Sequence, residues 1–405
     1  MKGIKMDNQR RAIYVVFAVL VAVFVFLSYF HEVIKMSLYR NFGDLGNYYF
    51  YSKALNLNYN VYSMDNETTE QLRKEFGMPP FIAVTLHSPA FLIMIKWITF
   101  FEYNSATIVW MLVNNILLLL SICIILKMAF EKIKNIDKGF VIASSAFLVF
   151  SFQPLLENTV LGQINPMIFF FFVLSLYCLD RKNEILSGIV LSLGILIKPH
   201  FGILLLFFLW KRCYRVFFSA AASLVLFEAL PILLGKIAAE RSYFAAVIDF
   251  LYRNLTDTTL SNLSLAALIN RINGTGGIIL TILVILCAYA AYITRERFRG
   301  SDLRFLLEFS LMLPLIFLIF PVVHEHHYIL LYLPIILLWA RLNKEPKLIP
   351  TVLFALSFLL IGLRYSLIQF PAFGSGFLSV FSGLKIYGVI MLFFLIAHEI
   401  GRKEE

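Results

Sequence analysis

Asp44 is the carboxylate of this chain whose position is best suited to acid–base chemistry. It follows the first long apolar segment by a few residues and lies beside Gly43, with Gly46 and the aromatic pair Tyr48 and Tyr49 after it. A carboxylate in such a place can remove the proton from an attacking hydroxyl. The same pattern is typical of a helix N-cap, because the aspartate precedes periodically spaced apolar residues. The two interpretations are compatible, and both are kept.

Two further polar clusters stand where apolar segments are interrupted. Gln163 and Asn165 lie between two apolar runs, and Pro166 after them is typical of the first turn of a helix. A turn and a cap explain Asn165 and Pro166, but they do not explain an amide at Gln163. Lys198, followed by Pro199, ends a long apolar run. Its amine can extend to the membrane surface or bind a phosphate as a point charge.

The densest polar cluster comprises His324, His326 and His327, three of the seven histidines of the chain. Histidine titrates near neutral pH, so proton transfer or phosphate binding suits these rings. Their spacing is not that of a helical zinc motif, in which two histidines four residues apart flank a glutamate. We predict catalytic roles for His326 and His327, with no metal and no cofactor. His87 and Asn262 stand in the two long polar stretches and are uninformative alone.

The composition indicates what must position these residues. Hydrophobic residues make up 60% of the 405 residues and charged residues 15%, whereas soluble domains carry about 25% charged residues. Only helices and closed barrels satisfy their backbone inside lipid. Barrel strands alternate between lumen and lipid, but residues 169–179 and 311–320 are apolar on every face. We therefore predict an all-α polytopic membrane protein, with residues 1–405 forming one domain.

The net charge of +10 does not indicate nucleic-acid binding. Lysine and arginine occur in short clusters between apolar segments, as the positive-inside rule expects. The four cysteines lie in or beside apolar segments without metal-ligand spacing. They are typical of small buried hydrophobic residues and predict no disulfide framework.

Thirteen apolar segments are candidates for membrane spans, which need about 20 residues each. They cover residues 12–30, 80–101, 105–127, 139–156, 164–179, 184–197, 199–211, 214–235, 278–294, 303–320, 327–341, 348–365 and 384–400. With a cytoplasmic N-terminus and all thirteen crossing, five consecutive basic loops would lie outside, against the positive-inside rule. If segment 80–101, which prolines and Lys96 interrupt, lies in the outer interface or re-enters, all five become cytoplasmic. We predict about twelve spans, cytoplasmic termini and long outer loops at 31–104 and 236–277.

This topology gathers the polar clusters on one face of the membrane, although it was derived from lysine and arginine alone. The residues expected on the outer face are Asp44, His87, Gln163, Asn165, Lys198, Asn262, His326 and His327. The sequence therefore predicts a single outward-facing site at the lipid boundary. The residues predicted to bind the donor phosphate or the substrate there are Lys198, Gln163, Asn165, Tyr48, Tyr49, His87 and Asn262.

The order of these clusters resembles glycosyltransferase family 87, the DUF2029 group. The family's Asp-Phe-x-x-Tyr-Tyr pattern is similar to residues 44–49, and its Gly-Gln-x-Asn to residues 162–165. Its Lys-Pro pair is similar to residues 198–199, and its Asn-x-Ser-Leu element matches residues 262–265. A Ser-Pro-x-x-Trp-x-His-His run is similar to residues 320–327.

The chain departs from these patterns at Leu45, at Phe320 and at His324, where the family has an aromatic residue, a serine and a tryptophan respectively.

The resemblance implies a GT-C-fold enzyme that uses a polyprenyl-phosphate sugar donor, similar to phosphatidylinositol-mannoside mannosyltransferases. It implies that Asp44 is the general base. The departing phosphate needs positive charge and hydrogen bonds, for which Lys198, His326 and His327 are the candidates. One base without a covalent intermediate predicts inversion at the anomeric carbon. The expected acceptor is a lipid or polysaccharide hydroxyl on the outer face of a bacterial cytoplasmic membrane, and mannose is the favoured sugar.

Two other classes of function stay open. A transporter or lipid-sugar flippase would place ionisable residues near the membrane midplane, often within internal repeats. Here Glu228 and Glu308 are the candidates for ionisable residues within apolar segments. A polysaccharide ligase or polymerase would take a diphosphate-linked donor, so donor specificity distinguishes it from the transferase.

Overall fold

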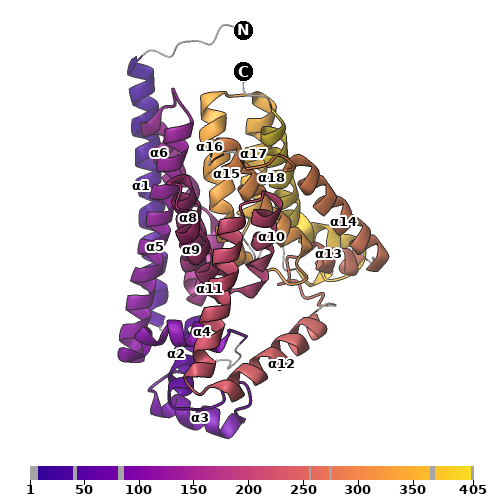
Figure 1. The fold of residues 1–405 in the computed structure, drawn as a ribbon. Helices are drawn as coiled ribbons and strands as arrows, with labels where there is room; N and C mark the ends of the chain where they lie inside the picture. Colours follow the sequence, from indigo (N-terminus) through magenta and orange to yellow (C-terminus); the bar gives the residue numbers. More distant parts are fainter. Residues whose placement is uncertain are drawn as a thin grey trace.

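The described part of the chain is helical throughout. The computed structural model describes residues 8–39, 43–80, 86–254, 257–272, 276–298, 300, 302–364 and 370–402. The helices form an upright bundle with a layer of shorter helices beneath it (Figure 1). Within those ranges no strand is present. The predicted all-α class is confirmed.

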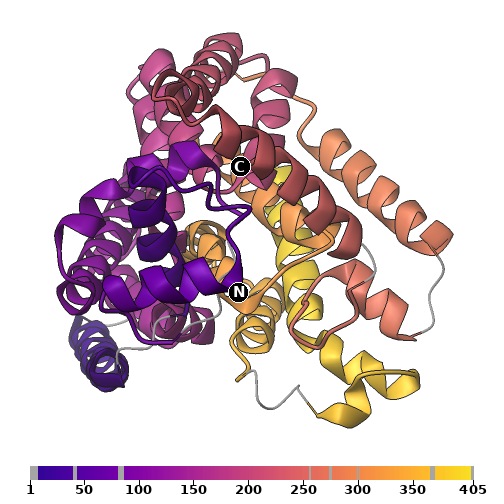
Figure 2. The ribbon, with the colours of Figure 1, turned by 90° about the horizontal axis from the view of Figure 1, so that it is seen from below.

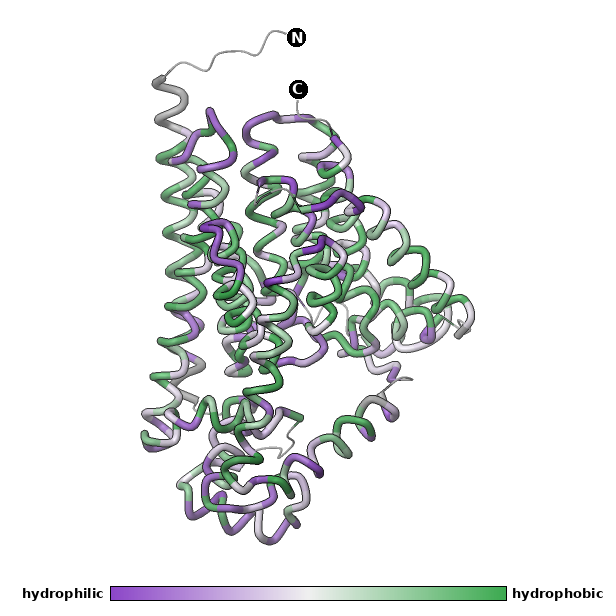
Figure 3. Tube along the Cα trace, in the orientation of Figure 1, coloured by the Kyte–Doolittle hydropathy of each residue, from purple (hydrophilic) through white to green (hydrophobic). Residues whose placement is uncertain are grey.

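Four helical segments among the described residues are long and apolar enough to cross a membrane alone. They lie in α1 (Asn8–Tyr39), α5 (Tyr103–Lys132), α11 (Tyr214–Leu233) and the stretch 377–401 that contains α18 (Leu384–Gly401). Helices α6 (Lys138–Phe150) and α7 (Gln153–Leu161) together have the length and composition of a span, but they meet at 51°, as in a broken span or a re-entrant loop. Figure 3 shows hydrophobic residues dominating the helices of the bundle, whereas hydrophilic residues are concentrated in loops and in the layer beneath it. The protein is a membrane protein.

The other predicted spans correspond to shorter helices. These are α8 (Asn165–Asp180), α9 (Glu184–Ile197), α10 (Ile203–Trp210), α14 (Gly276–Ile293), α15 (Leu303–Ile319), α16 (Tyr332–Lys344) and α17 (Leu348–Ile361). A helix of 14 residues, such as α9, extends about 21 Å, against a hydrocarbon thickness of about 30 Å. The number of twelve spans therefore stays a prediction.

Segment 80–101 does not form a long helix in its described part, residues 86–101. It folds as α4 (Pro89–Met94) and the 3-10 helix η1 (Lys96–Phe100). Ser88 caps α4 by accepting a hydrogen bond of 3.2 Å from the backbone N–H of Phe91. Six residues of helix extend about 9 Å, too short to cross a bilayer. Residues 81–85 lie outside the described part.

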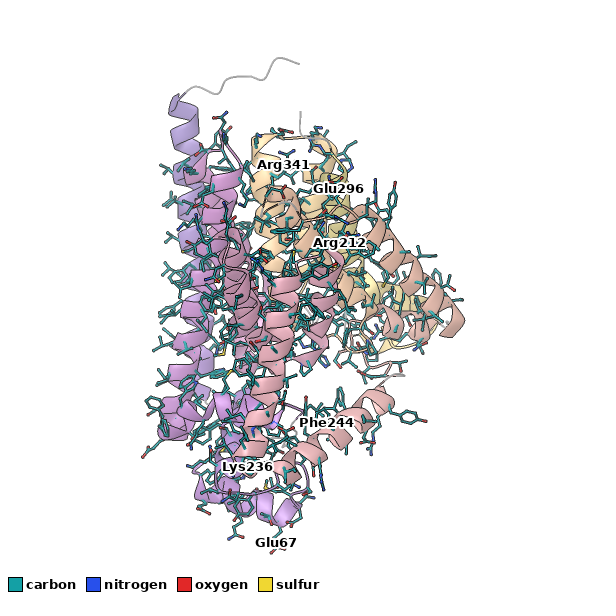
Figure 4. The ribbon with its side chains drawn as sticks, viewed as in Figure 1. Glu67, Arg212, Lys236, Phe244, Glu296 and Arg341 are labelled. Atoms are coloured by element: carbon teal, nitrogen blue, oxygen red, sulfur yellow. The ribbon has the colours of Figure 1, made fainter. Side chains whose placement is uncertain are left out.

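The two ends of the bundle separate the loops that the sequence assigned to opposite faces. The described part of the chain starts in α1 and ends in α18 at the same end of the bundle, which we call the terminal end (Figure 1). Arg341 and Glu296, from predicted cytoplasmic loops, lie near this end, whereas Glu67, Lys236 and Phe244 lie at the opposite one (Figure 4). We call that opposite end the loop end.

The loop end is covered by short helices from the two predicted outer loops, 31–104 and 236–277 (Figure 2). They are α2 (Gly43–Asn56), α3 (Asn66–Glu75), α12 (Ile237–Asn254) and α13 (Leu265–Ile272). Helix α12 has two distinct faces. Tyr243, Val247 and Phe250 recur at helical spacing on its inner face. Its outer face exposes Phe244, Ile248 and Tyr252 by 58%, 69% and 79%.

Helix α9 carries Lys198 at its end and is fixed by close packing against α11. A Cβ atom at Gly188 would lie 2.4 Å from the Val216 carbonyl oxygen and 2.0 Å from Ser219 Oγ. Only glycine permits two helix backbones to approach so closely. Gly188 therefore fixes the position of α9 and, with it, the position of Lys198 at the end of this helix.

Candidate active site

A cavity of about 790 Å³ lies at the loop end, between the bundle and α12. Small-molecule sites usually measure about 300–1,000 Å³. The wall is contributed by α2, α7, the turn after α9, α12 and the segment around the 3-10 helix η3 (Glu325–Leu331). The predicted site residues that line it are Asp44, Tyr48, His87, Gln163, Lys198, His326 and His327. Residues far apart in the sequence therefore meet in one cavity.

Asp44 lies in the first turn of α2, where the helix dipole favours a negative charge. Helix α2 begins at Gly43, so Asp44 is not the cap residue that the sequence pattern also allowed. Asp44 Oδ2 accepts a hydrogen bond of 2.7 Å from Gln163 Nε2. Gln163 Oε1 in turn accepts one of 3.0 Å from the Tyr48 hydroxyl. Burial raises the pKa of the Asp44 carboxyl, while Lys198 and the Gln163 hydrogen bond oppose that shift.

Gly162 turns the chain so that Gln163 reaches Asp44. It ends α7 with a φ of 67°, in the left-handed region that favours glycine. The backbone N–H of Gln163 donates to the Asn158 carbonyl at 2.9 Å. Trp110 Nε1 donates to the Gly162 carbonyl at 2.8 Å. The turn is thereby held from both sides, and the Gln163 amide serves as donor to Asp44 and acceptor from Tyr48.

Lys198 is held by a neutral partner. Its Nζ donates to Asn165 Oδ1 at 2.8 Å, and Asn165 Nδ2 donates to the His326 carbonyl at 3.0 Å. No described carboxylate forms a direct ion pair with this amine. Burial lowers the pKa of Lys198 to about 7, although Asp44 opposes the shift. The amine is thus placed to bind an anion that enters the cavity.

His326 and His327 lie in the first turn of η3, directly after Glu325, and line the cavity together with Lys198. The backbone N–H of His324 donates to His327 Nδ1 at 3.2 Å, so a neutral His327 carries its proton on Nε2. Burial lowers the pKa of both rings well below the ordinary value, and the charge of Lys198 adds to the shift. The two rings are therefore neutral at pH 7, and His327 Nε2 is a hydrogen-bond donor.

His87 lies against the aromatic wall of the same cavity. Its ring meets that of Tyr48 edge-on, with 5.0 Å between the centroids, and lies 4.8 Å from that of Phe91. Burial is the main cause that lowers the pKa of His87 to about 3. We therefore expect a neutral imidazole here.

Three predicted site residues do not line the cavity. Tyr49 lies next to Tyr48 on α2, but its hydroxyl donates to the Phe101 carbonyl at 2.9 Å. Asn165 is fully buried behind Lys198. Asn262 Nδ2 donates to the Pro321 carbonyl at 2.8 Å, and its Oδ1 accepts from the Val323 N–H at 3.1 Å. Tyr49 and Asn262 thus hydrogen-bond to backbone groups around the site, and their predicted contact with substrate stays a prediction.

Several residues that line the cavity were not selected from the sequence. Glu157 and Glu325 contribute carboxylates, and His200 contributes a ring 4.7 Å from that of Phe320. Glu325 stands inside the histidine cluster and Glu157 opens the segment that contains Gln163, so position alone was a usable signal. The i, i+4, i+7 spacing on α12 was a second signal.

Within the described ranges, no group of three or more His, Cys, Asp or Glu side chains is arranged to hold a metal ion. Residues 85–321 match the family model of glycosyltransferase family 87. The chain belongs to this family. No curated protein and no solved structure matches the chain. The matched region contains Gln163, Asn165, Lys198 and Asn262, whereas Asp44 and His326 lie outside it. This family-87 protein is a glycosyltransferase.

Proposed function

We propose that this family-87 enzyme transfers a sugar, with mannose favoured, from a polyprenyl-phosphate donor to a hydroxyl of a lipid or polysaccharide acceptor. The observation that carries the proposal is the presence, in one cavity, of a half-buried carboxylate, Asp44, and a half-buried amine, Lys198, that makes no direct ion pair with it. The reaction needs both groups at once, one for the acceptor hydroxyl and one for the donor phosphate.

The chemical step uses each group once. The acceptor oxygen attacks the anomeric carbon while Asp44 takes its proton. The bond between the anomeric carbon and the phosphate oxygen breaks, and its electron pair leaves with the polyprenyl phosphate. Lys198 and the Nε2–H of His327 stabilise the charge on the departing phosphate. Asp44 forms no bond to the sugar, so the anomeric configuration inverts.

The raised pKa of Asp44 suits a base. A carboxylate with a low pKa is a weak base. Burial raises the pKa of Asp44 toward the pH at which the enzyme works, which makes the carboxylate a stronger base. Gln163 donates to Oδ2, which leaves the other carboxylate oxygen, Oδ1, for the acceptor proton.

The composition of the wall favours a lipid-linked monophosphate. Apolar side chains, among them Ile197, Val247 and Val322, line the same cavity as Lys198. One lysine with neutral histidines suits the single phosphate of a polyprenyl-phosphate sugar. A ligase or polymerase would bring a diphosphate, which carries more charge than Lys198 alone would balance. A flippase would need a polar path through the bundle, whereas these groups gather at the loop end.

The proposal places the reaction on the outer face of a bacterial cytoplasmic membrane. Predicted cytoplasmic loops lie toward the terminal end, and the positive-inside rule orients that end toward the cytoplasm. The cavity at the loop end then faces outward, with membrane lipids around it.

The test is sugar transfer by the purified protein in nanodiscs, with radiolabelled polyprenyl-phosphate mannose and a membrane lipid extract. Wild type is compared with Asp44→Asn and with Asp65→Asn, an exposed aspartate that caps α3 by accepting from the Thr68 N–H at 2.7 Å. We expect label in a new product for wild type and Asp65→Asn only. Full transfer by Asp44→Asn would remove Asp44 as the base, and transport of label without bond formation would favour the flippase.

A further inference from the structure

The cavity has an acidic wall that the proposed transfer step does not use. Glu157 from α7 and Glu325 from η3 both line it. Behind Glu325 lies Lys385, which is fully buried and donates to Glu325 Oε1 at 3.0 Å and to the Ile361 carbonyl at 2.7 Å. Lys385 thus fixes one oxygen of Glu325 and holds the carboxylate in place.

The second oxygen of Glu325 is left without a partner. Glu325 is only 4% exposed, and its buried Oε2 accepts no hydrogen bond. Buried polar atoms without a partner are uncommon in native proteins and mark a place where a ligand or water binds. Because Glu325 belongs to the cavity wall, a ligand inside the cavity can supply the missing donor.

We propose that Glu325 and Glu157 form a subsite that binds the hydroxyl groups of a sugar ring. The inference rests on the proposed function, since it names where a sugar of the transfer reaction is held. A carboxylate accepts hydrogen bonds from two neighbouring hydroxyls at once, and two carboxylates on adjoining walls select a polyhydroxylated ligand.

The charge of this wall excludes the donor phosphate. Two carboxylates face the cavity with one lysine behind them, so a phosphate would meet repulsion here and attraction at Lys198. Burial raises the pKa of Glu325 to about 7, and Lys385 opposes the shift. A hydroxyl suits both protonation states, since it both donates and accepts hydrogen bonds.

The subsite lies next to the reaction centre. Glu157 precedes Gln163 by six residues, and both side chains line the same cavity. Glu325 precedes His326 directly on η3. A sugar bound between the two glutamates therefore lies within reach of Asp44 and Lys198. It is either the sugar being transferred or the terminal sugar of the acceptor.

The two sources are distinguished by ligands that contain one of them. The variants Glu325→Gln and Glu157→Gln are titrated in nanodiscs with octyl α-mannoside, with polyprenyl phosphate and with polyprenyl-phosphate mannose. We expect about tenfold weaker binding of a sugar-bearing ligand, the usual effect of losing a hydrogen bond to a charged group. A loss for octyl α-mannoside assigns the acceptor sugar. A loss for polyprenyl-phosphate mannose alone assigns the transferred sugar.

Sugar-free polyprenyl phosphate is the internal control, and its affinity is expected to stay within twofold of the wild-type value. Unchanged binding of both sugar ligands by both variants would overturn the inference. An equal loss for polyprenyl phosphate would overturn it as well, as would wild-type protein that binds neither sugar ligand saturably.

Two variants, each of which breaks one buried lysine–glutamate pair, serve as the control for loss of folding. Glu325→Gln removes the partner of Lys385, so its thermal stability is compared with that of Glu308→Gln, which breaks a buried lysine pair away from the cavity. Glu157→Gln breaks no ion pair of the described residues and keeps the test valid if Glu325→Gln unfolds. Intact sugar binding without any sugar transfer would count against the proposed function and leave the subsite standing.

Discussion

Two buried lysine–glutamate pairs of this protein have the same chemistry and different surroundings. Away from the cavity, Lys211 and Glu308 are 2.6 Å apart and at most 2% exposed, and the other oxygen of Glu308 accepts from Arg304 Nε at 3.3 Å. At the loop end, Lys385 and Glu325 are 3.0 Å apart and at most 4% exposed. There the other oxygen of Glu325 accepts nothing.

The comparison separates charges that hold the fold from charges that are available to a ligand. Near the terminal end the ion pairs are closed, as in Arg402, which binds Glu399 and Glu345 at 2.8 Å each. At the loop end, Asp44 and Lys198 are each held by a neutral amide, Gln163 or Asn165. An amide fixes the position of a charge without cancelling it. We therefore expect Asp44 and Lys198 to act on a ligand and the closed pairs to stabilise the fold.

The largest expected effect that tests this comparison is on turnover. Asp44→Asn keeps the size of the side chain but removes the base, so we expect turnover to fall by about 10²–10⁴-fold. Steady-state transfer of labelled sugar measures it. An unchanged melting temperature would show that the loss is chemical, whereas a turnover within threefold of wild type would remove the distinction drawn between the two ends.

The second prediction concerns the closed pair. Glu308→Gln leaves the Lys211 charge buried without its carboxylate, which typically lowers the free energy of unfolding by about 3–5 kcal/mol. Denaturant titration in detergent measures this. Turnover per folded molecule is expected to stay at the wild-type value, and a selective loss of turnover would assign this pair to function.

The third prediction concerns the amide-held lysine. Lys198→Gln removes a charged hydrogen-bond donor to phosphate, so we expect about 10- to 100-fold weaker binding of polyprenyl phosphate. The exposed Lys96→Gln is the matched control on the same face. Equal affinities of Lys198→Gln and wild type would show that the phosphate binds elsewhere.

The fourth prediction is a pH profile. The pKa of Lys198 is lowered to about 7 in the free protein, so kcat/KM for the donor should fall as pH rises through that value and the amine loses its charge. Asp44 must be ionised, and its raised pKa moves the acidic limb above the ordinary aspartate range. In Lys198→Arg the guanidinium stays charged, and the basic limb is expected to disappear. Persistence of that limb would assign it to another group.

The smallest expected effects come from two adjacent tyrosines. Tyr48→Phe removes the hydrogen bond to Gln163, worth about 1 kcal/mol, so we expect turnover to fall about fivefold. Tyr49→Phe removes the hydrogen bond to Phe101 and should lower only the stability, by about the same amount. Parallel turnover and unfolding measurements check the pair, and a reversed result would reverse their assignment.

The sequence predicted the cavity better than it predicted the role of each residue. Asp44, Gln163 and Lys198 could be grouped because lysine and arginine counts set the topology, and topology decides which loops share a face. Tyr49 and Asn262 do not line the cavity, because neighbouring helical positions point about 100° apart and a loop amide can bind the backbone as well as a ligand. No local pattern links Glu325 to Lys385, which follows 60 residues later.

Long helices could be predicted from the sequence, whereas short helices in the loops could not. Apolar runs predicted α5 and α11 as long helices, because the length of an uninterrupted apolar run gives the length of the helix. Helix α12 lies within the predicted outer loop 236–277 and was not predicted as a helix. Its mixed composition suits a helix at the membrane interface rather than a span. The number of spans depends on how short helices sit in lipid, which residue counts alone do not fix.

The two faces of α12 carry apolar side chains, one face on the surface of the protein and the other in the cavity wall. Phe244, Ile248 and Tyr252 face outward, while Tyr243 and Phe250 form part of the cavity wall. The exposed apolar face of α12 suits a place at the membrane interface, where a change in lipid thickness would shift the helix and the cavity wall together. We expect the size of the cavity to depend on the thickness of the surrounding lipid. The rate of sugar transfer should therefore vary with the acyl-chain length of the nanodisc lipid.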